Sequence, residues 1–178
     1  MMKNSLIALL LLCVGIVACE KLDEFTQFKM DYDSSVVIPS STGLNLPVDL
    51  FTPDVKTNSE SKFAINDTRK DLIEEITLDE LELTISSPDG EDFSFLKTID
   101  IYIEAEGLPK EKIAWHDDVS SVVGSTLSLE TAQVDLKEYI KKDEFTLMTE
   151  VVTDEALKSD HTIDIHTVFN VNAKILGI

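Results

Sequence analysis

The chain has few of the residues that carry covalent, redox or metal chemistry. Its 178 residues include two cysteines, Cys13 and Cys19, and both lie close to the start. With no later cysteine, the remainder can form neither a disulfide nor a thiolate metal site. Only six glycines and five prolines occur, so there is no glycine-rich phosphate loop and no Pro/Gly-rich linker. We therefore expect one domain, residues 25–178, that is stabilised by its hydrophobic core alone.

Positive charge is also scarce. The chain has 15 Lys and Arg residues against 34 Asp and Glu, and every acidic residue follows Cys19 while Lys3 precedes it, so the part after residue 18 carries a net charge of −20. Nucleic acid and anionic lipid headgroups both require clustered basic residues, so we expect neither to be a partner surface. Such acidity suits the choice of basic partners, or it is an ordinary solvated surface charge.

No hydrophobic run is long enough to span a bilayer, which takes about twenty residues. The run Leu6–Ala18 follows Lys3 and ends in Ile16-Val17-Ala18-Cys19. A short apolar stretch behind a positive charge is typical of an export signal. The ending resembles that of bacterial lipoprotein signal peptides, which implies a signal peptide over residues 1–18 and a lipid anchor on Cys19. A secretory signal that is cleaved nearby, or an uncleaved anchor, is the alternative.

Residues 19–24 would then form a lipidated tether. Five extended residues reach at most about 17 Å, so the domain is expected to stay close to its membrane. The segment Glu20-Lys21-Leu22-Asp23-Glu24 resembles the lysine-plus-acid signal that sends some Gram-negative lipoproteins to the cell surface, although Leu22 interrupts it. We expect a location in the cell envelope, at the outer membrane, with exposure at the cell surface as one outcome and an ordinary polar tether as the other.

Beyond Glu24, hydrophobic and polar residues alternate with period two, the pattern of half-buried strands. The clearest segments cover residues 28–32, 44–50, 81–85, 99–103, 127–129, 145–151 and 163–173. Polar residues on one side of each segment predict antiparallel sheets with one wet face. We predict an all-β fold, an antiparallel β-sandwich of immunoglobulin-like or related topology with seven to nine strands, ahead of a barrel. Pro47 marks an edge strand or a bulge, and residues 67–75 and 135–141 are predicted to form short helices.

Candidate metal ligands are few. His161 and His166 are five residues apart in a strand pattern, so their side chains point to opposite faces, and His116 lies far away in the sequence. We expect no metal and no cofactor. The carboxylates of Asp89-Gly90-Glu91-Asp92 could hold calcium, but Asp-Gly after Ser-Pro is also what a β-turn requires.

No catalytic motif stands out, since no Gly-x-Ser-x-Gly nucleophile elbow occurs. Trp115, the only tryptophan, is either a core or core-rim residue or an interface anchor. We interpret the chain as a non-catalytic binding or accessory module that uses a sandwich edge, its loops or its acidic face to engage an envelope protein or a glycan. The alternative is a small lipid-anchored hydrolase with an acidic dyad, acting on glycans.

Overall fold

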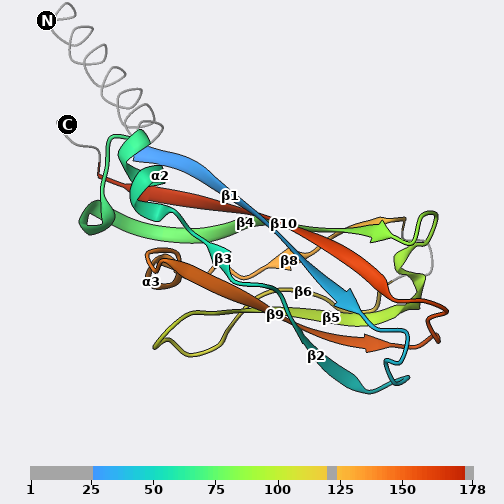
Figure 1. Ribbon diagram of the computed structural model, residues 1–178. Coiled ribbons are helices and arrows are strands. Elements are labelled where there is room, and N and C mark those ends of the chain that lie inside the picture. Colours follow the sequence, from blue (N-terminus) through green and yellow to red (C-terminus); the bar gives the residue numbers. More distant parts are fainter. Residues whose placement is uncertain (1–25, 120–123, 175–178) are drawn as a thin grey trace, which may run out of the picture.

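The computed structural model describes residues 26–119 and 124–174 of the chain (Figure 1). The expected signal peptide 1–18, the lipidation site Cys19 and the tether 19–24 lie outside the described residues. Within the described ranges, no helix has both the length and the hydrophobicity needed to cross a membrane.

Two antiparallel sheets pack face to face, which confirms the predicted β-sandwich, although the described residues form ten strands and not seven to nine. Sheet A has the order β1 (Gln27–Ile38), β10 (His161–Ala173), β4 (Ile73–Ser87) and β7 (Thr126–Ser128). Sheet B has the order β2 (Pro47–Phe51), β9 (Glu144–Thr153), β5 (Leu96–Glu104), β6 (Glu111–His116) and β8 (Glu130–Thr131), with the two-residue β3 (Val55–Lys56) also beside β9. Four short helical segments complete the described elements: α2 (Ser59–Ile65), η1 (Lys70–Leu72), η2 (Phe93–Phe95) and α3 (Lys137–Ile140).

The strand order is that of a jelly roll, in which the chain moves repeatedly from one sheet to the other. The first long strand, β1, lies beside the last, β10, and β2 lies beside β9, while β4 and β5 occupy the inner positions of the two sheets. This nested order is the double Greek key of two-sheet jelly rolls. It leaves β1 and β7 at the edges of sheet A, and β2 and β8 at the edges of sheet B.

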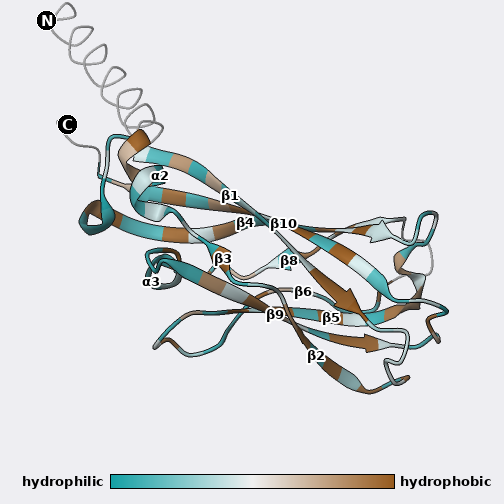
Figure 2. Cartoon of the chain, viewed as in Figure 1, coloured by the Kyte–Doolittle hydropathy of each residue, from teal (hydrophilic) through white to brown (hydrophobic). Residues whose placement is uncertain are grey.

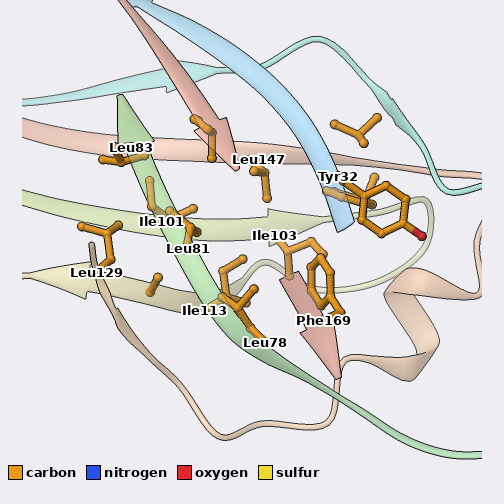
Figure 3. Packing of buried hydrophobic residues seen from close by; sticks show 14 of the residues in the cluster. Tyr32, Leu78, Leu81, Leu83, Ile101, Ile103, Ile113, Leu129, Leu147 and Phe169 are labelled. Atoms are coloured by element: carbon orange, nitrogen blue, oxygen red, sulfur yellow. The ribbon is translucent and has the colours of Figure 1, made fainter. Parts of the chain in front are cut away.

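The core lies between the sheets and follows the period of two. Along β10, buried residues alternate with partly exposed ones from His161 to Ala173, and Figure 2 shows the same alternation of hydrophobic and hydrophilic residues along the strands. Tyr32, Phe145 and Phe169 pack edge to face, with ring centroids 5.4 to 6.2 Å apart, and Figure 3 shows Tyr32 and Phe169 among the buried residues of the core. Burial of one such side chain contributes about 1.5–3 kcal/mol, so packing stabilises a domain that contains no cysteine.

Of the two predicted helices, one is present in shortened form and the other is absent. At 135–141 the structure has the shorter α3, with Tyr139 and Ile140 buried as expected. The helix predicted at 67–75 is wrong, because only η1 forms there and β4 begins at Ile73. Ile76 lies opposite Val171 of β10, so pairing with a long neighbouring strand overrides the local helical pattern. Pro47 begins β2, an edge strand, as predicted.

Candidate binding face

The site is built around Trp115 on β6, and a β-bulge sets its direction. Ala114 lies opposite Ile101, and Lys112 lies opposite the next residue of β5, Tyr102, so Ile113 is an extra residue in β6. Both Ile113 and Ala114 point into the core and are fully buried. Without the bulge, side chains three residues apart would lie on opposite sides of the sheet. With it, Lys112 and Trp115 both stand on the outer face of sheet B, and Trp115 is half-buried there, outside the core.

A row of large side chains crosses this outer face beside Trp115. Phe51 of β2 lies opposite Met148 of β9, and Met148 lies opposite Tyr102 of β5. Phe51 is 55% exposed, whereas Met148 is 2% exposed because its neighbours cover it. Trp115 lies diagonally across from Tyr102, a separation of about 7–8 Å that aromatic side chains can bridge. The outer side of sheet B therefore carries aromatic and methionine side chains where solvent-facing strands usually carry polar ones.

A second row, next to the first, is acidic. Asp49 of β2 lies opposite Glu150 of β9, which lies opposite Asp100 of β5, and Asp100 lies opposite Trp115. Like charges directly across a strand pair are destabilising. Lys112 forms an ion pair with one of these three acids, since its Nζ lies 2.7 Å from Asp100 Oδ1. We call these two rows together the aromatic face; its members are Phe51, Met148, Tyr102, Lys112, Asp49, Glu150, Asp100 and Trp115.

Two lysines lie over the rings of the aromatic face. Lys110 Nζ is 4.4 Å from the centroid of Tyr102, and Lys112 Nζ is 5.5 Å from that of Trp115. Lys110 Nζ also lies 3.5 Å from Met148 Sδ. Burial is the largest single influence on Lys112 and lowers its pKa, but the hydrogen bond and the charge attraction to Asp100, with smaller contributions from nearby groups, together raise the pKa above its ordinary value. Both cations therefore cover ring faces that a flat ligand would need to reach.

The outer face of sheet A has a different chemistry. We call it the acidic face; its members are Asp31 and Asp33 of β1, Asp164 and His166 of β10, and Glu80 and Glu82 of β4. His166 lies between Asp33 and Glu82 in the register of the three strands. Its Nδ1 is 2.7 Å from Asp33 Oδ1, and this hydrogen bond raises the pKa of the imidazole.

The three histidines do not converge. His161 is 2% exposed and points into the sandwich, whereas His166 lies on the outer face of the same strand, as the spacing predicted. The Nδ1 of His161 donates to the carbonyl of Ser159 at 2.9 Å, and its Nε2 lies 4.0 Å from Glu91 without a hydrogen-bond partner among the described residues. His116 ends β6 in the other sheet. Across residues 26–119 and 124–174, no three His, Cys, Asp or Glu side chains are grouped to hold a metal ion.

The segment Asp89–Asp92 forms a turn. Gly90 has a φ of +81°, a conformation that glycine adopts without strain. Asp92 precedes η2 and its Oδ1 accepts the backbone N–H of Ser94 at 2.9 Å. The hydrogen bonds from Ser94 lower the pKa of Asp92, so this carboxylate caps a helical turn.

Sequence reasoning singled out Trp115 but not its neighbours. Tyr102 occupies a polar-side position in the predicted strand 99–103, so its exposure could have been read from the alternation. The approach of Phe51 and Met148 depends on pairing between strands about one hundred residues apart, for which one sequence carries no signal.

No protein-family model matches the chain, and no curated protein matches it. Among solved structures, distant similarity is found to a chain of turnip yellow mosaic virus, with 13% identity over 85% of this chain and 96% of that chain and a TM-score of 0.31. The crystal structure of FLHE shares 8% identity over 82% and 98% of the two chains, with a TM-score of 0.30. CpGH89CBM32-5 from Clostridium perfringens, solved in complex with GalNAc-β-1,3-galactose, shares 12% identity over 85% and 99%, with a TM-score of 0.30.

Proposed function

We propose that the chain is a lipid-anchored protein of the cell envelope whose β-sandwich is a non-catalytic binding module. In this proposal the aromatic face docks a protein that presents basic groups. The observation that carries it is the apolar row Phe51–Met148–Tyr102 lying beside three facing acids on the solvent side of one sheet. Aromatic side chains are enriched in protein interfaces, and Phe51 at the end of this row is 55% exposed. Arginine or lysine from a partner would relieve the repulsion within the acidic row.

The covered rings favour a protein over a glycan as the partner. A sugar ring stacks on the open face of an aromatic side chain, and here Lys110 and Lys112 lie over Tyr102 and Trp115. A protein surface can instead contact the exposed edge of Phe51 and exchange ion pairs with the lysines and acids around it. Tyrosine and tryptophan are also the residues that dominate binding energy in protein interfaces.

Two loop carboxylates with shifted pKa values are poor candidates for the acid of a glycosidase. A glycosidase needs one carboxylic acid whose pKa is raised, so that it can donate a proton at neutral pH. The pKa values of Asp92 and Asp160 are instead lowered, because their carboxyl groups accept hydrogen bonds from Ser94 and Ser40, respectively. These carboxylates act as hydrogen-bond acceptors that fix loops.

The proposed anchor agrees with the way the chain enters the sandwich. β1 starts at Gln27, at the end of the sandwich that carries α2 and α3 (Figure 1). A tether of five residues reaches at most about 17 Å, so an anchor on Cys19 would hold this end next to the membrane. The strands of sheet B run lengthwise away from that end, which would leave the aromatic face open to a partner beside the protein.

Site-specific photo-crosslinking in the native envelope tests the docking face. A photoreactive residue at Phe51 is expected to give a discrete adduct with a protein, and the pair Tyr102→Ala with Trp115→Ala is expected to weaken that contact by about tenfold or more, as for interface hot spots. The same photoreactive residue at Ile65 of α2, which is 80% exposed, is the matched control and should give no such adduct. An adduct that disappears on glycosidase treatment, or one that both alanine changes leave intact, would contradict the proposal.

A second test addresses the anchor. Cys19→Ser removes the sulfur that would carry the lipid, so the variant is expected to lose acyl labelling and to leave the membrane fraction. The measurement is metabolic labelling with a fatty-acid probe, followed by fractionation. Cys13→Ser is the control, because a cysteine within the signal should not affect the result. Continued labelling of the Cys19 variant would rule out the anchor.

A further inference from the structure

The four sheet edges are unequal, and β1 is the long one. Among the described residues, β7 has three residues and β8 has two. The edge strand β2 has five residues, begins at Pro47 and is followed by Pro53. Short strands and prolines are the usual means by which proteins blunt an edge against further pairing. β1 has twelve residues with neither proline nor glycine, so its edge lacks both devices.

The backbone of β1 presents alternate residues to this open edge. In an antiparallel strand, the N–H and C=O of one residue point to the same side, and those of the next residue point to the other. The carbonyl of Tyr32 accepts a hydrogen bond from Thr167 of β10, on the paired side. The carbonyl of Asp31 accepts one from Lys62 Nζ of α2 at 2.7 Å, on the open side. By the same alternation, the N–H and C=O groups of Asp33 and Ser35 point to the open side, where no described residue binds them.

A groove lies along this edge. It has a volume of about 710 Å3 and is lined by residues of β1, of the segment 53–58 that contains β3, and of β10 and β4. Asp33 and Ser35 line it together with Pro53, Val55 and Lys62. The groove also includes Asp164 of the acidic face. The residues whose backbone groups point to the open side therefore also line a groove.

We propose that an extended, basic segment of a partner protein adds to β1 as a further strand of sheet A. Main-chain hydrogen bonds to Asp33 and Ser35 would supply the attachment, as in other cases of strand addition. Acids outnumber lysines in the groove, which favours a basic occupant: its lining includes Lys56 and Lys62 against Asp31, Asp33, Asp54, Glu82 and Asp164. A second copy of this chain would bring its own aspartates against them, so the same charges disfavour self-pairing. This site is independent of the aromatic face, which lies on the other sheet.

The probe is a capped ten-residue peptide that alternates lysine with threonine, measured against the full-length protein in mild detergent. Alternation places all lysines on one side of the added strand, next to the aspartates. We expect binding that weakens with added salt, and no binding of the counterpart in which glutamate replaces lysine. Two further peptides carry N-methyl groups, one on the lysines and one on the threonines. Only one set of N–H groups faces β1, so one methylated peptide should lose affinity by about tenfold and the other should retain it.

The matched protein variants are Ser35→Pro and Ser35→Ala. Proline removes the outward N–H at an edge position where it is tolerated, whereas alanine keeps that N–H. We expect the proline variant to bind the lysine peptide about tenfold more weakly and the alanine variant to bind as the parent does.

Equal binding of both methylated peptides would overturn the proposal, because a purely ionic contact would then explain the binding. Tyr102→Ala with Trp115→Ala should leave peptide binding unchanged, and Ser35→Pro should leave the Phe51 adduct unchanged, so each site can fail without the other.

Discussion

The two outer faces of the sandwich are built from the same alternation and yet carry different chemistry. On the acidic face, each acid lies opposite a neutral residue or a histidine, as with Asp31 opposite Val168 and Asp33 opposite His166. On the aromatic face, Asp49, Glu150 and Asp100 lie opposite one another in one row. The first arrangement spaces like charges apart, whereas the second brings them together beside exposed rings.

The difference indicates that the aromatic face, and not the acidic face, lowers the stability of the isolated protein. Facing acids are unfavourable in an isolated sheet, and exposure of the apolar side chain of Phe51 to water brings no stabilisation. A partner that supplies cations and covers the rings would make both features favourable. The acidic face has no such conflict, because its charges can remain solvated, and sheet A offers a partner the backbone of its β1 edge. Sheet B thus would bind through side chains and sheet A through main-chain groups.

The largest effect that sharpens this comparison is expected at Glu150. Glu150→Gln keeps the size of the side chain and removes the charge between Asp49 and Asp100. We expect the free energy of unfolding to rise by about 0.5 kcal/mol, since two facing like-charge pairs disappear. The gain should shrink in high salt, which screens surface charges. Urea denaturation at low and high salt measures it.

The matched change on the acidic face is Glu82→Gln. Glu82 lies opposite His166 and Ser128, so its charge faces no other acid. We expect no gain in the free energy of unfolding, or a slight loss. An equal gain from both substitutions would show that overall negative charge, and not the acidic row, governs the effect, and the contrast between the faces would fail.

The architecture was largely predictable from the sequence. Strands 145–151 and 163–173 could be predicted because only one face of each sheet packs against the other sheet. Their hydrophobic residues therefore alternate with polar ones, as Ile163, Ile165 and Phe169 do. β4 was predicted only in part, because Ile73 and Ile76 near its start are three residues apart, the spacing of a helix face. The strand order could not be predicted, because it depends on pairing between strands far apart in the sequence, which local patterns do not encode.

The candidate site was predictable at one residue. Trp115 is notable in any reading of the chain, but its direction depends on the bulge at Ile113. A regular register would have sent Lys112 to the opposite face from Trp115. Bulges depend on how two strands fit together, so the aromatic face becomes visible only when the strands are paired.

The smallest expected effect concerns His166, whose pKa is raised above its ordinary value of 6.5 chiefly by the hydrogen bond that its Nδ1 donates to Asp33. A pKa that is raised in the folded state stabilises the protein fully below pH 6.5, and this stabilisation is lost as pH rises through the folded-state pKa. The two side chains are 44% and 81% exposed, so solvent screening limits the contribution to about 0.5 kcal/mol or less. Asp33→Asn should therefore lower the pKa of His166 and flatten the dependence of stability on pH above 6.5.

An NMR titration of the His166 ring protons, with urea denaturation at several pH values, makes the measurement. Asp31 and Glu80 also raise the pKa of His166, so Asp33→Asn is expected to lower it only part of the way. Asp164→Asn is the matched control, because Asp164 lies on the same face but opposite Ser35 and Thr84, and it should change the titration less. If the control moved the pKa as far as Asp33→Asn does, the acidic face would act through its summed charge, and the pairwise spacing that distinguishes it from the aromatic face would have no energetic consequence.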